Sequence, residues 1–192
     1  MPTPDRHRGP FARLGLTGIA FVWGAAEAAL FFIVPDVLIS FVVLRNLRLG
    51  LRLAIWATAG SLLGGAFMYA WGAGDPMRAF EMLNSLPAIT HLLIKEVGHG
   101  LETHGLAAML TGPVLGVPYK IYAAQAGALD FSFLSFLLYT LPARLPRFLI
   151  VALVVWYLSR RAEPHLSFEA RVGVLAAGWI IFYIGYFVLM PG

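Results

Sequence analysis

Apolar residues in this chain fall in long runs that short polar segments separate. The first run extends from Leu14 to Leu44 and contains two carboxylates, Glu27 and Asp36, with Pro35 beside the second. Further apolar runs cover residues 53–74, 106–127, 131–141, 148–158 and 172–190. Because a helix needs about 20 mostly apolar residues to cross a bilayer, the pattern predicts an all-α membrane protein with several spanning helices.

The first run is interrupted in its second half. Pro35 lacks a backbone N–H and disfavours helix at the residue before it, so a break is expected there. Residues 37–44 are too few to cross a bilayer as a helix. Basic residues flank the run on both sides: Arg6, Arg8, Arg13, Arg45, Arg48 and Arg52. Since both flanks are basic, we expect a re-entrant hairpin that returns to the side from which it entered.

The run 106–127 has the same character. Four helix-breaking residues interrupt it: Gly112, Pro113, Gly116 and Pro118. Two broken elements, each followed by a more regular span, are typical of transporters whose site forms where the breaks meet. The predicted fold is therefore an all-α polytopic transmembrane helical bundle with two opposed re-entrant hairpins.

Composition and charge agree with a membrane protein. Of the 192 residues 59% are hydrophobic and 12% charged, against roughly 25% charged in a soluble domain. The basic residues gather at the ends of apolar runs, as in membrane proteins, and form no stripe suited to nucleic acid. We expect a basic cytoplasmic tail (1–13), a membrane domain (14–161), and a cytoplasmic linker with a last transmembrane helix (162–192). Segment 77–104 is amphipathic, has nearly balanced charge and is expected on the extracytoplasmic side.

Ionisable residues within the apolar runs are the candidate site, because their burial in a membrane is costly. They are Glu27, Asp36, Lys120, Arg144 and Arg147. Arg144 and Arg147 are three residues apart and share a helix face, from which they could neutralise the two carboxylates. The alternative is that these residues form ion pairs with a purely structural role, which hold the broken elements together.

Each candidate suits a different task. A carboxyl group taken out of water can take up and release a proton near neutral pH, so Glu27 and Asp36 are the proton-coupling candidates, Glu27 the better one. Arginine forks match phosphate oxygens, which makes Arg144 and Arg147 candidates for binding a lipid phosphate. Lys120 could assist them or could extend to the membrane interface. The chain has no cysteine, and no metal motif is found.

Four motifs, in order, resemble those of the DedA/VTT (SNARE-associated) membrane proteins and their short bacterial YqaA-like branch. They are Glu27 with Val34-Pro35-Asp36, the segment 59–65 with Tyr69 and Gly72, the segment 111–120 with 124–127, and Pro142-Ala-Arg-Leu-Pro-Arg147. The resemblance implies two facing re-entrant hairpins and translocation of undecaprenyl phosphate or phospholipids. Glu27 and Asp36 match the family's hairpin acids, and Arg144 and Arg147 its late arginines. Thr111 replaces an arginine usual in the family, and the usual Pro-Gly is also missing at 117–119.

We therefore expect a lipid flippase or scramblase in the bacterial inner membrane that moves an anionic phospholipid or undecaprenyl phosphate, coupled to protons. Its expected partners are lipids and protons, without nucleic acid, cofactor or metal, and a homo-oligomer remains open. Two other classes stay open: an integral membrane enzyme acting on lipid phosphates, and a non-transporting membrane assembly protein. An enzyme would form product from a lipid phosphate, and an assembly protein would regain function when Glu27 and Arg144 are exchanged.

Overall fold

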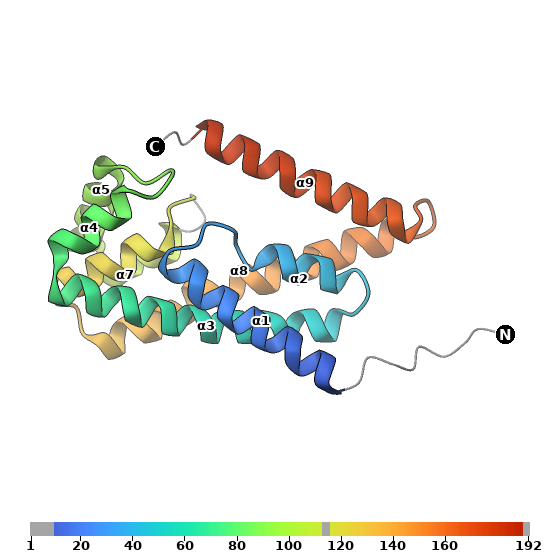
Figure 1. The fold of residues 1–192 in the computed structure, drawn as a ribbon, viewed down its shortest axis with the longest axis horizontal. Helices are drawn as coiled ribbons and strands as arrows, with labels where there is room; N and C mark the ends of the chain where they lie inside the picture. The colour runs from blue at the N-terminus through green and yellow to red at the C-terminus, as the bar shows by residue number, and fades with distance from the viewer. Residues whose placement is uncertain (1–9, 113–115, 190–192) are drawn as a thin grey trace.

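A computed structural model describes residues 10–112 and 116–189, which form helices and contain no strand. The elements are α1 (Pro10–Ala29), α2 (Asp36–Val43), α3 (Leu47–Gly74), α4 (Pro76–Asn84), α5 (His91–His104), the 3₁₀ turn η1 (Gly105–Ala107), α6 (Ala108–Thr111), α7 (Tyr119–Ala128), α8 (Phe133–Ala162) and α9 (Phe168–Leu189). The predicted all-α class is confirmed. Figure 1 shows α3 and α8 running along most of the molecule in opposite directions.

Helix α3 is the centre of the bundle and packs against α1, α2, α4, α7 and α8. Its small residues let backbones come close, as expected for helices that pack in a membrane. A Cβ atom at Gly60 would meet the carbonyl oxygen of Phe21 on α1, and one at Gly72 would meet that of Ala124 on α7. These glycines therefore let α3 contact α1 on one side and α7 on the other.

This packing predicts that Gly60→Val lowers stability. The new side chain would press on backbone atoms of α1, which cannot rotate away, and overpacking of this kind costs about 1–3 kcal/mol. The control is Gly178→Val on α9, where a Cβ atom has nothing within 4 Å. The unfolding midpoint in detergent should fall for Gly60→Val and stay near the wild-type value for Gly178→Val. Equal midpoints would contradict the described α1–α3 contact.

The first broken element has the predicted break, but α1 ends earlier than expected. Helix α1 stops at Ala29, where the N–H groups of Leu30 and Phe31 both donate to the Ala26 carbonyl. Residues 30–35 are not helical, and α2 starts directly after Pro35. Figure 1 shows α2 returning toward the end of the molecule where α1 begins and α3 starts.

The structure describes the other end of α1 from Pro10 onward. The helix begins at Pro10, so residues 10–13 of the expected basic tail lie in its first turn. Proline suits this position because its fixed φ angle fits a helix and its missing N–H would have had no partner there. The remaining tail residues, 1–9, lie outside the described part of the chain.

The second broken element also has its break where expected. Helix α6 ends at Thr111, and α7 begins at Tyr119, directly after Pro118. Between them Gly116 has a φ angle of 85°, in the left-handed region that glycine adopts without strain. Gly112 closes the turn through its carbonyl, which accepts the Val117 N–H at 3.0 Å. Pro113, the remaining predicted break residue, lies outside the described residues.

The last two helices differ in how they pack. Helix α8 is continuous through Pro142 and Pro146; such prolines are tolerated in membrane helices when neighbours satisfy the freed carbonyls. Helix α9 has no buried residue and packs mainly on α2. Segment 77–104 forms the amphipathic helices α4 and α5, whose first turns are capped by Asp75 and Thr90.

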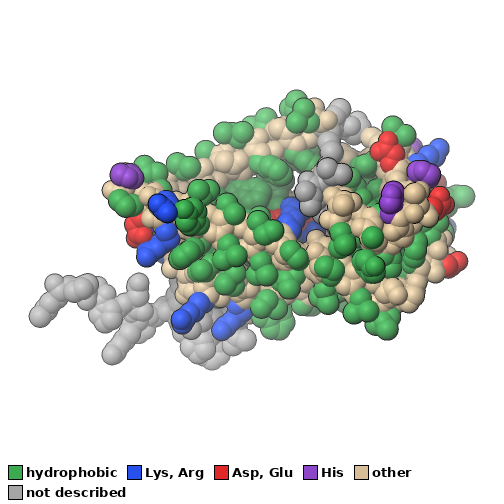
Figure 2. All heavy atoms as spheres, turned by 180° about the vertical axis from the view of Figure 1, so that it is seen from behind, with side chains coloured by type: hydrophobic (Ala, Val, Ile, Leu, Met, Phe, Trp, Pro, Cys, Tyr) green, Lys and Arg blue, Asp and Glu red, His purple; other side chains and the backbone are tan. Residues whose placement is uncertain are grey.

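Helices α3, α8 and α9 are long and apolar enough to cross a membrane, which indicates a membrane protein. In the space-filling view, charged side chains gather toward the two ends and apolar ones cover most of the length between them (Figure 2). One end of the molecule in Figure 1 is formed by the α2–α3 turn with the start of α3 and by the α8–α9 linker, and the other by α4, α5 and the α7–α8 turn. In the sequence, the first group of segments carries Arg45, Arg48, Arg52, Arg160, Arg161 and Arg171 with Glu163 and Glu169, and the second carries Asp75, Arg78, Glu81, Lys95, Glu96, Glu102 and Asp130. The first end is therefore basic and the second acidic.

Candidate functional site

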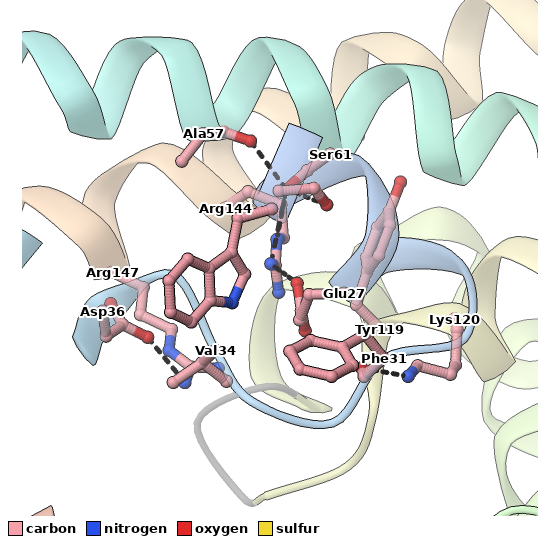
Figure 3. A network of polar contacts seen from close by, with 12 residues as sticks. Glu27, Phe31, Val34, Asp36, Ala57, Ser61, Tyr119, Lys120, Arg144 and Arg147 are labelled. Carbon is pink, nitrogen blue, oxygen red and sulfur yellow. Dashed lines mark hydrogen bonds and ion pairs between the residues drawn. The ribbon is translucent and has the colours of Figure 1, made fainter. Parts of the chain in front are cut away.

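Two ion pairs connect α8 to the first broken element. The Arg144 guanidinium donates to a carboxylate oxygen of Glu27, and Arg147 Nη2 lies 2.9 Å from Asp36 Oδ2. Both contacts are drawn in Figure 3, where the two arginines point from α8 toward the first broken element. The expectation that these arginines share a face and meet the two carboxylates is confirmed.

Residues of several helices contact the Arg144 side chain. Its side chain is 1% exposed, and its guanidinium carbon lies 5.1 Å from the ring centre of Tyr119 and 4.9 Å from that of Phe148. Ser61 on α3 accepts from Arg144 Nη2 at 3.3 Å. The pair with Glu27 is therefore enclosed by α1, α3, α7 and α8, a setting in which removing one partner leaves a buried charge.

The second pair is more open. Asp36 is fully buried, whereas the Arg147 side chain is 31% exposed. Asp36 lies in the first turn of α2, where the helix dipole favours a negative charge. Its second oxygen, Oδ1, has no hydrogen-bond partner among the residues that the structure describes. Arg147 can therefore reach a ligand while Asp36 stays enclosed.

Lys120 connects the two broken elements. It lies in the first turn of α7, is 2% exposed, and its Nζ donates to the Phe31 carbonyl at 2.8 Å. The ammonium also lies 4.6 Å from the ring centre of Phe32. Within residues 10–112 and 116–189 no carboxylate forms an ion pair with it. Lys120 is therefore a buried cation that no carboxylate of the described residues pairs with directly, unlike a lysine that extends to the membrane interface.

A cavity of about 480 Å³ lies where the two breaks meet. Glu27, Lys120 and Arg147 line it, whereas Arg144 and Asp36, the ion-pair partners of Glu27 and Arg147, do not. The remaining wall comes from the first break (Phe31, Phe32, Val34), the second (Gly116, Val117, Pro118), α8 (Ile150, Val151) and α9 (Phe182, Tyr183, Tyr186). Figure 2 shows a hollow near the middle of the molecule in which blue atoms are visible.

Three contributors to this region were not predicted from the sequence. Ser61 and Tyr119 surround Arg144, and Tyr183 of α9 accepts the Val34 N–H at 2.9 Å. Each is a polar group inside an apolar segment, which is the signal that could have pointed to it. By contrast His91, His99 and His104 lie exposed on α5, and the described residues contain no group of three or more possible metal ligands.

Comparison with known proteins gives a similar protein but no family. An uncharacterized protein of Haemophilus influenzae is 26% identical over 189 residues, which cover 96% of this chain and 92% of that protein. No protein-family model matches the chain, and no solved structure matches it. The similarity extends over almost the whole length of both chains, so it includes both broken elements and α8.

Proposed function

We propose that the chain is a membrane lipid transporter of the DedA/VTT family, a flippase or scramblase in the bacterial inner membrane. Its substrate is an anionic phospholipid or undecaprenyl phosphate, and its movement is coupled to protons. The observation that carries this proposal is the cavity at the junction of two broken helices, lined by Lys120, Arg147 and Glu27. It lies between the charged ends of an otherwise apolar molecule.

In this proposal the two broken elements are opposed re-entrant hairpins. Irregular backbone at membrane depth is tolerated only where protein or a water-filled cavity covers it. Residues 31–34 and 116–118 both line the cavity, and the Lys120–Phe31 hydrogen bond joins the two breaks. The basic end of the molecule, which contains the α2–α3 turn and the α8–α9 linker, faces the cytoplasm, as basic flanks do.

The charges of the site favour an anionic headgroup. Three cations (Lys120, Arg144, Arg147) face two carboxylates (Glu27, Asp36), and Lys120 is the cation without an acidic partner among the described residues. A phosphate in the cavity would supply the missing negative charge and accept charge-assisted hydrogen bonds from Lys120 and Arg147. Acyl chains would remain among the apolar side chains of the wall.

The proposed proton coupling arises because the phosphate competes with Asp36 for the Arg147 guanidinium. When a phosphate takes over this guanidinium, Asp36 loses its counter-charge while it remains buried. A buried carboxylate without a counter-charge is neutralised by taking up a proton. Glu27, which lines the cavity, can exchange that proton with water. Arrival of the anionic headgroup is thereby linked to protonation of the first hairpin.

The proposal predicts that Lys120→Gln weakens transport of anionic lipids. In liposomes containing the purified protein, the initial rate at low concentrations of fluorescent phosphatidylglycerol should fall about tenfold or more, since a hydrogen bond to a charged group contributes about 1.5–3 kcal/mol. The matched control is Lys95→Gln, because Lys95 is exposed on α5. The rate of this variant should equal that of the wild type. A Lys120→Gln protein with an unchanged rate would contradict the assigned role.

A further inference from the structure

Helix α9 is the least firmly packed of the three candidate spans. None of its 22 residues is buried, whereas α3 and α8 bury residues along their lengths. Two polar contacts hold its middle to the first hairpin: Trp179 Nε1 donates to Ser40 Oγ at 2.9 Å, and Tyr183 Oη accepts the Val34 N–H at 2.9 Å. At its beginning Arg171 Nη1 donates to Ser159 Oγ of α8 at 3.0 Å.

The Tyr183 hydroxyl accepts a hydrogen bond from the backbone of the first break. Val34 belongs to the non-helical segment between α1 and α2, so its N–H has no helical carbonyl and needs another acceptor. The Tyr183 hydroxyl is that acceptor, and it lies on the wall of the cavity together with Val34, Lys120 and Arg147. A backbone N–H, an ammonium and a guanidinium around one cavity form a donor set suited to phosphate oxygens.

We propose that α9 is a removable wall of this cavity, and that the Tyr183 hydroxyl occupies the position which a phosphate oxygen of an anionic lipid takes on the Val34 N–H. This inference rests on the proposed function for the nature of the ligand. The phosphate displaces Tyr183, and the middle of α9 moves away from α2 while its beginning stays attached near Ser159. The opening between α9 and α8, beside Ile150 and Val151, admits the acyl chains.

Cross-linking tests the movement without measuring transport. The chain has no native cysteine, so Ser40→Cys with Trp179→Cys can be joined by a short thiol-specific cross-linker. The control pair, Val155→Cys with Val174→Cys, reports on the attached beginning of α9, because both residues line one cavity with Ser159 and Arg171 and leave their hydrogen bond intact. Short-chain phosphatidylglycerol should lower the yield of the first pair several-fold and leave the second unchanged.

The arms of this experiment separate the sources of the phosphate. Short-chain phosphatidylcholine tests whether net negative charge is required, and inorganic phosphate tests whether the headgroup chemistry is sufficient without acyl chains. We expect little effect from phosphatidylcholine and a smaller effect from inorganic phosphate than from phosphatidylglycerol. Yields that phosphatidylglycerol leaves unchanged at both pairs would overturn the inference, even if the protein transports lipid. A lipid-dependent yield in a protein that moves no lipid would instead overturn the proposed function alone.

Tyr183→Phe tests whether the hydroxyl occupies the position that a phosphate oxygen takes on the Val34 N–H. The variant keeps the ring but leaves the Val34 N–H without its acceptor, so a phosphate no longer has to break this hydrogen bond when it binds. Its affinity for phosphatidylglycerol should rise about threefold to tenfold, the range of one net hydrogen bond. Tyr186→Phe is the matched control, because Tyr186 lines the same cavity and donates no hydrogen bond within the described residues. An unchanged or lower affinity of Tyr183→Phe would overturn the role, since a purely structural tyrosine predicts no gain.

Discussion

Replacing Glu27 with glutamine should abolish the dependence of lipid movement on a proton gradient. Glutamine has nearly the same shape and keeps an oxygen that can accept from Arg144, but it cannot take up a proton. The measurement compares the transfer rate of fluorescent phosphatidylglycerol in liposomes with and without a pH gradient. The wild-type rate should change with the gradient, and the rate of Glu27→Gln should be the same in both conditions.

Two controls accompany this experiment. Glu102→Gln alters an exposed carboxylate of α5 and should respond to the gradient like the wild type. The unfolding midpoint of Glu27→Gln shows whether the protein is folded, because Arg144 loses its counter-charge in this variant. A folded Glu27→Gln protein that still responds to the gradient would rule out Glu27 as the proton carrier.

Replacing Arg144 with methionine should give the largest loss of stability of any single change at the site. The substitution leaves the Glu27 carboxylate buried without its partner and removes the contacts with Tyr119, Phe148 and Ser61. Breaking a buried ion pair in this way costs about 3–5 kcal/mol. Equilibrium unfolding in detergent measures the effect, and an unchanged free energy of unfolding would contradict the described environment of Arg144.

The double variant Glu27→Leu with Arg144→Met separates stability from function. Apolar replacement of both partners of a buried pair is often neutral or stabilising, so most of the lost stability should return. As in Glu27→Gln, lipid movement should no longer respond to a pH gradient, because the carboxylate proposed to carry protons is gone. Normal transport by the double variant would show that the pair is an inert structural contact.

Local chemistry made much of the fold predictable. Pro35 and Pro118 predict the two breaks because a proline disfavours helix at the residue before it. Helices α2 and α7 begin directly after these two prolines. The pairing of Arg144 and Arg147 with the two carboxylates was also predictable. Few charges lie in the apolar runs, and a spacing of three puts both arginines on one helix face.

Other features depend on contacts between distant segments and could not be predicted in this way. Ser61 meets Arg144 only because α3 crosses both α1 and α8, and Tyr183 meets Val34 across 149 positions of the chain. Helix α8 continues through Pro142 and Pro146, although a proline inside a helix removes a backbone hydrogen bond. Whether the helix continues there was not predicted from the sequence.

The most direct test of the central claim is lipid transfer by the purified protein alone. Fluorescent phosphatidylglycerol in the inner leaflet of liposomes becomes accessible to a membrane-impermeant quencher once it reaches the outer leaflet. The proposal predicts a quenching rate well above that of protein-free liposomes, lowered by Lys120→Gln and unaffected by Lys95→Gln. A rate equal to that of protein-free liposomes, measured with folded protein, would contradict it.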